Sequence, residues 1–330
     1  MIVALIGAYI LHIPSLERII ARYKDRLGTC HKSTLSLCLR RPSFVRFADA
    51  MLSHLCGPLR LSTRDIIALD SMGMTISRRR KSDAAKINNK THGLFVIWQV
   101  IINARRGCAP VRLLKLVHKA CNDAGHSRSL DLAQGPIYLM DRGFWCFEAM
   151  RRWGQAGVRF VVRARKDLCI YQAVKVMGQP RKIGRVNILF DGIAWIGAGK
   201  SVQMRLVWAK VGKEDLILAS SMMSASAQQL LALYEKRWQI ERFHRFMKNM
   251  LGLAHLYSFQ RNGMELLVRI CLIAAILLFF ASKPCKLTVD TLIKRLEAIR
   301  TALGIEKPIR RNSCIRRWRK KISKSKEQNQ

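Results

Sequence analysis

LYEKRWQIERFHRFMKNMLGL, residues 233–253, is the most informative stretch of this sequence. Its apolar residues recur at helical spacing, and Tyr234, Arg237, Glu241 and Lys248 stand at offsets 0, 3, 7 and 14. At about 100° per residue, these four side chains fall within an arc of about 60° on one helical face. A single face of the predicted helix therefore carries a phenol, a guanidinium, a carboxylate and an ammonium group.

Two aspartates upstream of this helix follow apolar runs that are typical of β-strands. Asp70 ends the run DIIALD, and Asp141 follows the run PIYLM. Ligand sites in an α/β sheet form at the carboxyl ends of strands, so we expect both aspartates to converge with Glu241 from an adjacent helix. Three hard oxygen donors without a His or Cys ligand suit Mg²⁺ or Mn²⁺. Phosphodiester chemistry uses such ions in pairs, one at the attacking oxygen and one at the leaving oxygen.

Each of these carboxylates, taken alone, also has a purely structural explanation. Asp70 or Asp141 can be a turn residue at a strand end. Glu241 can be the i,i+4 partner of Arg237 or Arg245 on the helix surface. The combination of two strand ends with one basic helical face favours the functional interpretation.

The charge balance points to a polyanionic partner. The chain of 330 residues has 59 Lys and Arg against 21 Asp and Glu, a formal net charge of +38. Because the basic residues are interleaved with apolar ones, most of this charge should decorate a folded body that follows phosphates, which excludes disorder throughout the chain. Arg78, Arg79 and Arg80 are predicted to contact the nucleic-acid backbone, with a solvated turn as the alternative.

Neither the cysteines nor the apolar runs indicate a secreted or membrane protein. The ten cysteines are scattered, without a C-x-x-C pair or a zinc-like spacing, and fit a reduced cytosol. The apolar runs over 1–13 and 270–281 are shorter than the roughly 20 residues that span a bilayer. We therefore predict buried helices for both runs and no membrane partner.

Periodicity and turn residues divide the chain into five segments. The first, 1–62, has the pattern of a small basic helical unit that either grips DNA or braces the next domain. Strands around a helix predict an α/β sheet domain over 63–165, and short strands between turn residues predict a β-rich stretch over 166–222. Two long helices are expected over 223–283, and a further helix with a basic tail over 284–330.

The stretch over residues 233–253 resembles a signature of one group of mobile-element enzymes. Its Y-x2-R-x3-E-x6-K pattern is similar to that of bacterial insertion-sequence transposases of the DDE superfamily, the insertion sequence four group. Trp238 also resembles the usual surroundings of this signature. Asp70 followed by Ser71, and the run DRGF over 141–144, look like the first and second aspartates of the family.

The resemblance implies a fold and a site. It implies an RNase H-like catalytic core in which Asp70, Asp141 and Glu241 bind two Mg²⁺ or Mn²⁺ ions. A β-strand insertion would lie between the second aspartate and the glutamate, and a small basic helical region would precede the core. The DNA contacts implied by this resemblance come from the helix and from one tryptophan of the insertion: Tyr234, Arg237, Trp238, Lys248, and either Trp195 or Trp208. A tryptophan in an alternating strand is otherwise a core residue.

The implied activity is DNA transposition. Such an enzyme binds the terminal inverted repeats of its element as double-stranded DNA, hydrolyses the phosphodiester at each end, and joins the 3′-hydroxyl ends to target DNA. It is expected to work as a homodimer in a synaptic complex in the bacterial cytosol, associated with the nucleoid. Two alternatives stay open: a decayed remnant or other basic protein that binds nucleic acid without cleaving it, and a metal-dependent nuclease that cleaves without strand transfer.

Overall fold

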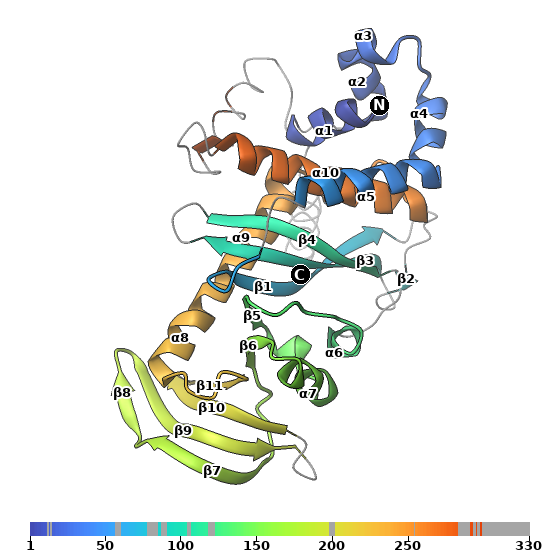
Figure 1. Ribbon diagram of the computed structural model, residues 1–330. Helices are drawn as coiled ribbons and strands as arrows, with labels where there is room; N and C mark the ends of the chain where they lie inside the picture. The colour runs from blue at the N-terminus through green and yellow to red at the C-terminus, as the bar shows by residue number, and fades with distance from the viewer. Residues whose placement is uncertain are drawn as a thin grey trace, which may run out of the picture.

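The structure of this chain is a computed structural model (Figure 1). It describes residues 1–11, 13, 15–56, 61–77, 85–86, 91–103, 107–117, 123–197, 202–253, 255–282, 291–292, 295 and 298. The basic run of Arg78, Arg79 and Arg80 lies outside these residues, as does almost all of the segment over 284–330.

Within the described residues, eleven strands form one mixed sheet. The strands are β1 (Ile66–Ser77), β2 (Ala85–Lys86), β3 (Thr91–Asn103), β4 (Gly107–Val117), β5 (Ile137–Met140), β6 (Arg159–Arg163), β7 (Ile170–Gly178), β8 (Arg181–Ile183), β9 (Val186–Ile196), β10 (Val202–Val211) and β11 (Glu214–Ser220). Their order along the main path is β2-β3-β1-β5-β6-β11-β10-β9-β7, with β4 beside β3 and β8 beside β9.

The strands β4-β3-β1-β5-β6 form the core of this sheet. β1 pairs in parallel with β5, β5 pairs in parallel with β6, and β3 joins β1 and β4 by antiparallel pairing. An antiparallel meander that continues into parallel strands is the arrangement of an RNase H-like core. The predicted α/β class with this core is therefore confirmed.

β1 extends well beyond the aspartate at which the predicted strand ended. The strand continues from Asp70 to Ser77, because its second half pairs with β3 as far as the pair Ser77 and Thr91. The prediction that Asp70 lies at a strand end was therefore wrong. The partner of this half-strand lies beyond a long connection in the sequence, so local composition did not reveal the pairing.

The strands β7 to β11 all fall within residues 166–222, where the sequence predicts a β-rich stretch. β11 pairs antiparallel with β6, at Leu218 opposite Arg163, so the core sheet continues directly into these strands. Figure 1 shows them as a curved layer at the bottom of the molecule, below the core strands.

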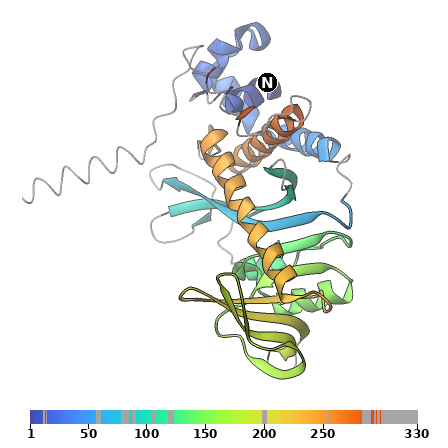
Figure 2. The same ribbon diagram turned by 90° about the vertical axis from the view of Figure 1, so that its left-hand side faces the viewer.

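The helices lie on both sides of the sheet and above it. Their bounds are α1 (Ile2–Ile10), α2 (Leu16–Arg22), α3 (Lys24–Leu27), α4 (Lys32–Leu39), α5 (Pro42–Cys56), α6 (Asp123–Ser127), η1 (Arg142–Phe144), α7 (Phe147–Gln155), α8 (Ala227–Glu235), η2 (Lys236–Trp238), α9 (Gln239–Arg245), η3 (Phe246–Met250) and α10 (Arg261–Ser282). The elements α8, η2, α9 and η3 follow one another without a break over residues 227–250, and we call this continuous helical segment the rod. Figure 2 shows it crossing the sheet from the β7–β11 layer to the upper helices.

This rod is the helix predicted from residues 233–253, with two local irregularities. A capping box begins the rod: the Ser226 hydroxyl accepts a hydrogen bond from the Gln229 N–H, and the Gln229 side-chain oxygen accepts one from the Ser226 N–H. η2 is a 3₁₀ turn and η3 is a π-helical turn. Gly252 follows with φ 66°, a left-handed conformation that favours glycine and ends the helix.

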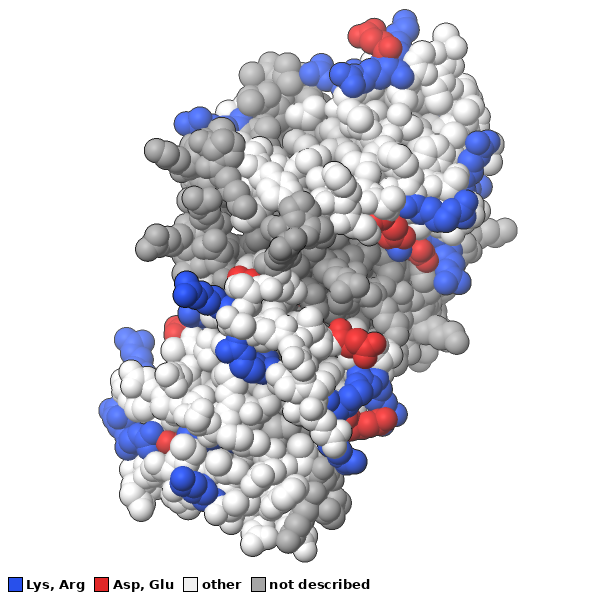
Figure 3. Space-filling model, viewed as in Figure 1, with Lys and Arg blue, Asp and Glu red and all other residues white. Residues whose placement is uncertain are grey.

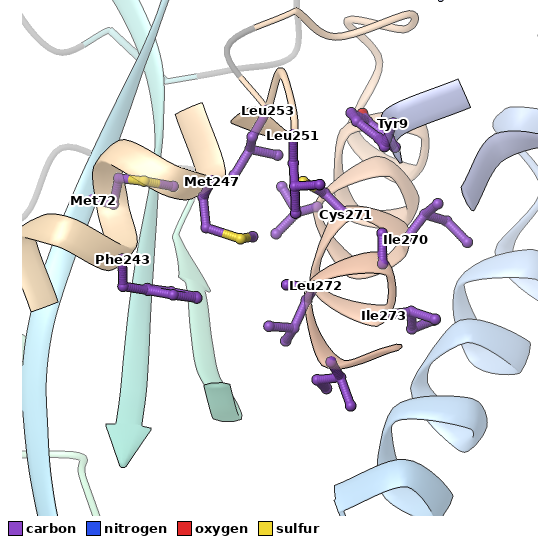
Figure 4. Close-up of a cluster of buried hydrophobic side chains, with 14 of the residues drawn as sticks. Tyr9, Met72, Phe243, Met247, Leu251, Leu253, Ile270, Cys271, Leu272 and Ile273 are labelled. Atoms are coloured by element: carbon purple, nitrogen blue, oxygen red, sulfur yellow. The ribbon is translucent and has the colours of Figure 1, made fainter. Parts of the chain in front are cut away.

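The main core lies between this rod, β1 and the upper helices. Met72 from β1 and Phe243 and Met247 from the rod are buried on one side, and residues such as Cys271 and Leu272 of α10 on the other (Figure 4). Burying each large apolar side chain contributes about 1.5–3 kcal/mol. This packing fixes the rod against the strand that carries Asp70.

α10 is long and apolar enough to cross a membrane, by length and composition only, but 72% of its most apolar window is buried inside the protein. It contacts α1, α5 and η3. Within the described residues α10 is thus a core helix, as the sequence predicts for the apolar run over 270–281.

Candidate active site

Asp70 and Asp141 lie side by side on neighbouring parallel strands. Leu69 of β1 is in register with Met140 of β5, so the next residue of each chain segment is one of the two aspartates. Each carboxylate accepts a hydrogen bond from a nearby backbone N–H. Ser71 N lies 2.8 Å from Asp70 Oδ1, and Gly143 N lies 3.2 Å from Asp141 Oδ1.

The Asp70 carboxyl is held in an unfavourable environment for its charge. Burial, with a smaller contribution from the nearby Asp141 and Asp123 carboxylates, raises the pKa of Asp70 to about 7, although the Ser71 N–H and Arg237 oppose the shift. Its side chain is 17% exposed. A buried group with a pKa near neutrality, close to other carboxylates, is typical of a functional site.

The rod presents Arg237 to this pair of aspartates. Arg237 Nη1 lies 4.0 Å from Asp70 Oδ2, and Arg237 Nη2 lies 3.0 Å from Glu241 Oε1. The Lys248 ammonium group is also within electrostatic reach of Asp70, which opposes the burial that lowers the pKa of Lys248. Two side chains of the predicted helical face, Arg237 and Lys248, therefore lie near Asp70 despite the π-helical turn.

Tyr234 completes this face at its first turn. The guanidinium carbon of Arg237 lies 5.6 Å from the centre of the Tyr234 ring. Burial raises the pKa of Tyr234, and the Asp141 carboxylate adds to the shift. The hydroxyl oxygen is buried beside the Arg237 guanidinium, which can only donate to it, so the Tyr234 O–H itself has no acceptor among the described residues. A buried donor without a partner next to the carboxylates is suited to a ligand oxygen.

His244, from the same helical rod, also lies at the site. Its Nδ1 lies 3.8 Å from Asp70 Oδ2, and its side chain is only 14% exposed. Burial lowers the pKa of His244 to about 4, helped by the positive Lys248 and Arg237, so the ring is neutral at pH 7. The signal was present, since His244 stands two helical turns after Arg237 on the same face.

Asp123 is the carboxylate that sequence reasoning missed. Burial raises its pKa, and the Asp141 carboxylate contributes to the shift, while a side-chain hydrogen bond with Ser71 and the nearby His126 oppose it. It stands eighteen residues before Asp141, at the start of the short helix α6, where nothing in the local pattern marks it. Only the folded structure brings it next to Ser71 in β1 and Gly143 after β5.

The pair of aspartates suits a divalent cation, but Glu241, the third predicted ligand, is not placed with them to hold one ion. A buried carboxylate whose pKa is raised by burial and by neighbouring carboxylates, as Asp70 is, gains from a positive ion, and hard oxygen atoms are the ligands that Mg²⁺ and Mn²⁺ prefer. Glu241 is 42% exposed and pairs with Arg237. Among the described residues, no group of three His, Cys, Asp or Glu side chains is placed to hold one ion.

The remaining predicted contact residues lie on the rod and in the strands β9 and β10. Trp238 in η2 is 53% exposed on the rod. Trp195 in β9 and Trp208 in β10 are both half-buried, and Trp208 packs against the smaller hydrophobic core. Basic side chains lie over both the upper helices and the strand-rich lower part on the face shown in Figure 3.

The comparisons with known proteins identify the family of this chain. Residues 61–277 match the family described as Transposase DDE domain, a span that contains Asp70, Asp141 and Glu241. The chain is also 24% identical over 250 residues to a protein of Sinorhizobium fredii named "Putative transposase y4zB", a similarity that covers 71% of this chain and 68% of that protein. Since the family match spans more than half of the sequence, the chain belongs to the transposase DDE domain family.

Proposed function

We propose that this transposase binds the terminal inverted repeats of an insertion sequence of the insertion sequence four group, cleaves both ends, and joins the 3′-hydroxyl ends to target DNA. The observation that carries the proposal is the register of β1 and β5, which sets Asp70 beside Asp141 under a basic helical face. A formal net charge of +38 supports a DNA substrate.

Asp70, Asp141 and Glu241 would hold two Mg²⁺ or Mn²⁺ ions, which supply activation of the attacking oxygen and stabilisation of the leaving oxygen. The two aspartates are pre-positioned by the N–H groups of Ser71 and Gly143. Glu241 joins them only after it exchanges its Arg237 partner, and a phosphate group is a suitable new partner for that guanidinium.

The side chains of the rod would bind and orient the scissile strand. Arg237 offers a planar fork for two phosphate oxygens, and Lys248 offers a point charge. The Tyr234 O–H, which has no acceptor among the described residues, can donate to a further oxygen. His244, neutral at pH 7, acts as a hydrogen-bonding group and not as a cation. The reaction is then an in-line displacement at phosphorus, first by water and afterwards by the 3′-hydroxyl.

Further contacts and partners are part of the same proposal. Trp238, together with the basic run of Arg78, Arg79 and Arg80, would contact DNA outside the active site. The helices before residue 63 would contribute to end recognition, and the strands within 166–222 would act as an insertion in the core. The enzyme would act in the bacterial cytosol as a homodimer that brings the two element ends together.

A second candidate function is DNA binding without catalysis, as in a decayed transposase. The pairing of Glu241 with Arg237 favours it, as does the lack, among the described residues, of three side chains placed to hold one ion. Under that alternative, the basic helix serves only to hold DNA, and the carboxylate serves as a local helix partner.

The test uses the purified full chain and duplex DNA that carries the repeats flanking its own gene. Strand breaks and joined products are mapped with Mg²⁺, Mn²⁺ or EDTA, in the presence of a target plasmid. We expect breaks at the repeat boundary and joining to the plasmid, both dependent on metal. Breaks without joining would identify a nuclease, and binding without breaks would favour the decayed transposase.

A further inference from the structure

The two aspartates share one mode of support. Asp70 accepts the N–H of Ser71, and Asp141 accepts the N–H of Gly143, at 2.8 and 3.2 Å. The positions of Ser71 and Gly143 therefore set the positions of the two carboxylates. A group that fixes the separation of Ser71 and Gly143 therefore also fixes the separation of the two aspartates.

Asp123 makes that connection. Its carboxylate is hydrogen-bonded to the Ser71 side chain. On its other side it lies against Gly143, so closely that a Cβ built on Gly143 would stand 2.6 Å from Asp123 Oδ2 and 3.3 Å from Asp123 Cβ. One side chain from α6 thus contacts both residues whose backbone N–H groups support the aspartates.

The backbone of Asp123 is itself fixed. The Ser127 hydroxyl donates to the Asp123 carbonyl at 2.9 Å and lies 3.1 Å from the carbonyl of Phe144. Ser127 is fully buried. These contacts hold α6 against the turn η1, and they thereby hold the backbone that carries the Asp123 carboxylate in place.

We propose, building on the function proposed above, that Asp123 is a positioning residue that sets the separation of Asp70 and Asp141. It acts through the Ser71 hydroxyl on β1 and through contact with Gly143 after β5. Catalytic constellations have to be held within about 0.5 Å of their working geometry, and groups behind the metal ligands supply that constraint. Asp123 itself touches neither the DNA nor the reacting atoms in this role.

The first experiment measures native-state amide hydrogen exchange at Gly143 without metal. Ser71→Ala removes one hydroxyl on β1, yet it should speed exchange at Gly143 about fivefold, because the released Asp123 no longer holds the turn. Asp123→Ala should have the same effect, and the double variant should add nothing to it. Asp123→Asn keeps an acceptor oxygen for Ser71 and should retain the wild-type rate.

The second experiment measures the Mn²⁺ concentration that gives half of the full thermal stabilisation. Ser71→Ala and Asp123→Ala should each raise this concentration about tenfold or more, as is usual for residues that support metal ligands. Asp131→Asn serves as the matched control, because Asp131 lies a few residues along the chain with a 98% exposed side chain. It should behave like the wild type in both experiments.

The two readouts separate the possible failures. If the wild type gains no stability from Mn²⁺, the proposed metal-dependent function fails, while exchange at Gly143 still decides the role of Asp123. Unchanged Gly143 exchange in folded Ser71→Ala and Asp123→Ala proteins would overturn the positioning role. Should Asp123→Ala not fold, Ser71→Ala alone gives the same decision, since it removes only one hydroxyl.

Discussion

Arg237 and Glu241 form an ion pair one helical turn apart, with 3.0 Å between Nη2 and Oε1. The other nitrogen of the same guanidinium reaches to 4.0 Å from Asp70 Oδ2. Arg237 therefore stands between the glutamate of the rod and the aspartate of the sheet. In the absence of DNA and metal, one arginine provides the positive charge near both carboxylates.

This position predicts the effect of removing Arg237. Arg237→Ala should weaken binding to the element ends, because one phosphate contact is lost, and it should reduce the slope of log K against log salt by about one unit. Arg237→Lys should keep the slope but lose part of the affinity, since the bidentate fork is gone. Filter binding over a series of salt concentrations measures both. An unchanged slope for Arg237→Ala would show that this side chain contacts no phosphate.

The pKa of Asp70 predicts how stability depends on pH. Its folded-state pKa of about 7 lies above the value of about 3.9 in an unfolded chain, so the folded state binds the extra proton. The metal-free protein should lose stability as pH rises from about 4 through 7 and change little above that, by up to about 4 kcal/mol from this group.

Asp70→Asn tests this expectation, because the amide stays neutral. In EDTA, denaturant titrations should find Asp70→Asn more stable than the wild type at pH 8 and similar to it at pH 4. Asp131→Asn, at an exposed position, should show no such difference. Equal stability of Asp70→Asn and wild type at pH 8 would contradict the unfavourable environment of Asp70.

A buried ion pair joins the β7–β11 strands to the start of the rod. Arg205 is fully buried, pairs with Asp191, and donates to the Ala225 carbonyl at 3.0 Å and the Gly192 carbonyl at 2.9 Å. Ala225 directly precedes the helix cap at Ser226. The strands that surround Arg205 thereby set where the helix that carries Glu241 begins.

Asp191→Ala should lower the free energy of unfolding by about 3–5 kcal/mol, because it leaves a buried guanidinium without its counter-charge. Urea denaturation measures the loss. Asp215→Ala on the adjacent strand β11, where the aspartate is half-buried, is the comparison and should cost much less. A loss below about 1 kcal/mol for Asp191→Ala would show that water or another group replaces the pair.

The close contact of Gly143 and Asp123 predicts a compensating pair of substitutions. Gly143→Ala should destabilise the protein, since the new Cβ would meet Asp123 Oδ2 at 2.6 Å. In an Asp123→Ala background the same substitution should cost clearly less, because the clash is removed. Thermal melts of the four proteins give the coupling energy. Strict additivity would mean that the two residues do not touch in solution.

The sequence alone predicts those parts of the site that depend on patterns of neighbouring residues. The spacing of Tyr234, Arg237 and Glu241 depends only on helical geometry, and the structure turns this face toward Asp70, as the distance from Arg237 shows. The apolar runs before Asp70 and Asp141 likewise give two strands, whose parallel pairing brings the aspartates together.

Features that depend on distant partners were not predicted. The continuation of β1 past Asp70 comes from pairing with β3, and the role of Asp123 comes from contacts with Ser71 and Gly143. The burial of His244 beside Asp70 likewise depends on the packing of the rod against the sheet. The pairing of Glu241 with Arg237 was weighed from the sequence, but periodicity alone did not decide between this partner and the aspartates.

The central claim is that Glu241 acts with Asp70 and Asp141 in metal-dependent cleavage of the element ends. The most direct test maps strand breaks at the flanking repeats in Mg²⁺ for wild type, Glu241→Gln and Glu235→Gln. Glu235 is exposed on the same rod, so its substitution is a matched control for the change in charge. We expect Glu235→Gln to cleave like the wild type and Glu241→Gln to bind the ends without cleaving them. Cleavage by Glu241→Gln at the wild-type rate would contradict the account.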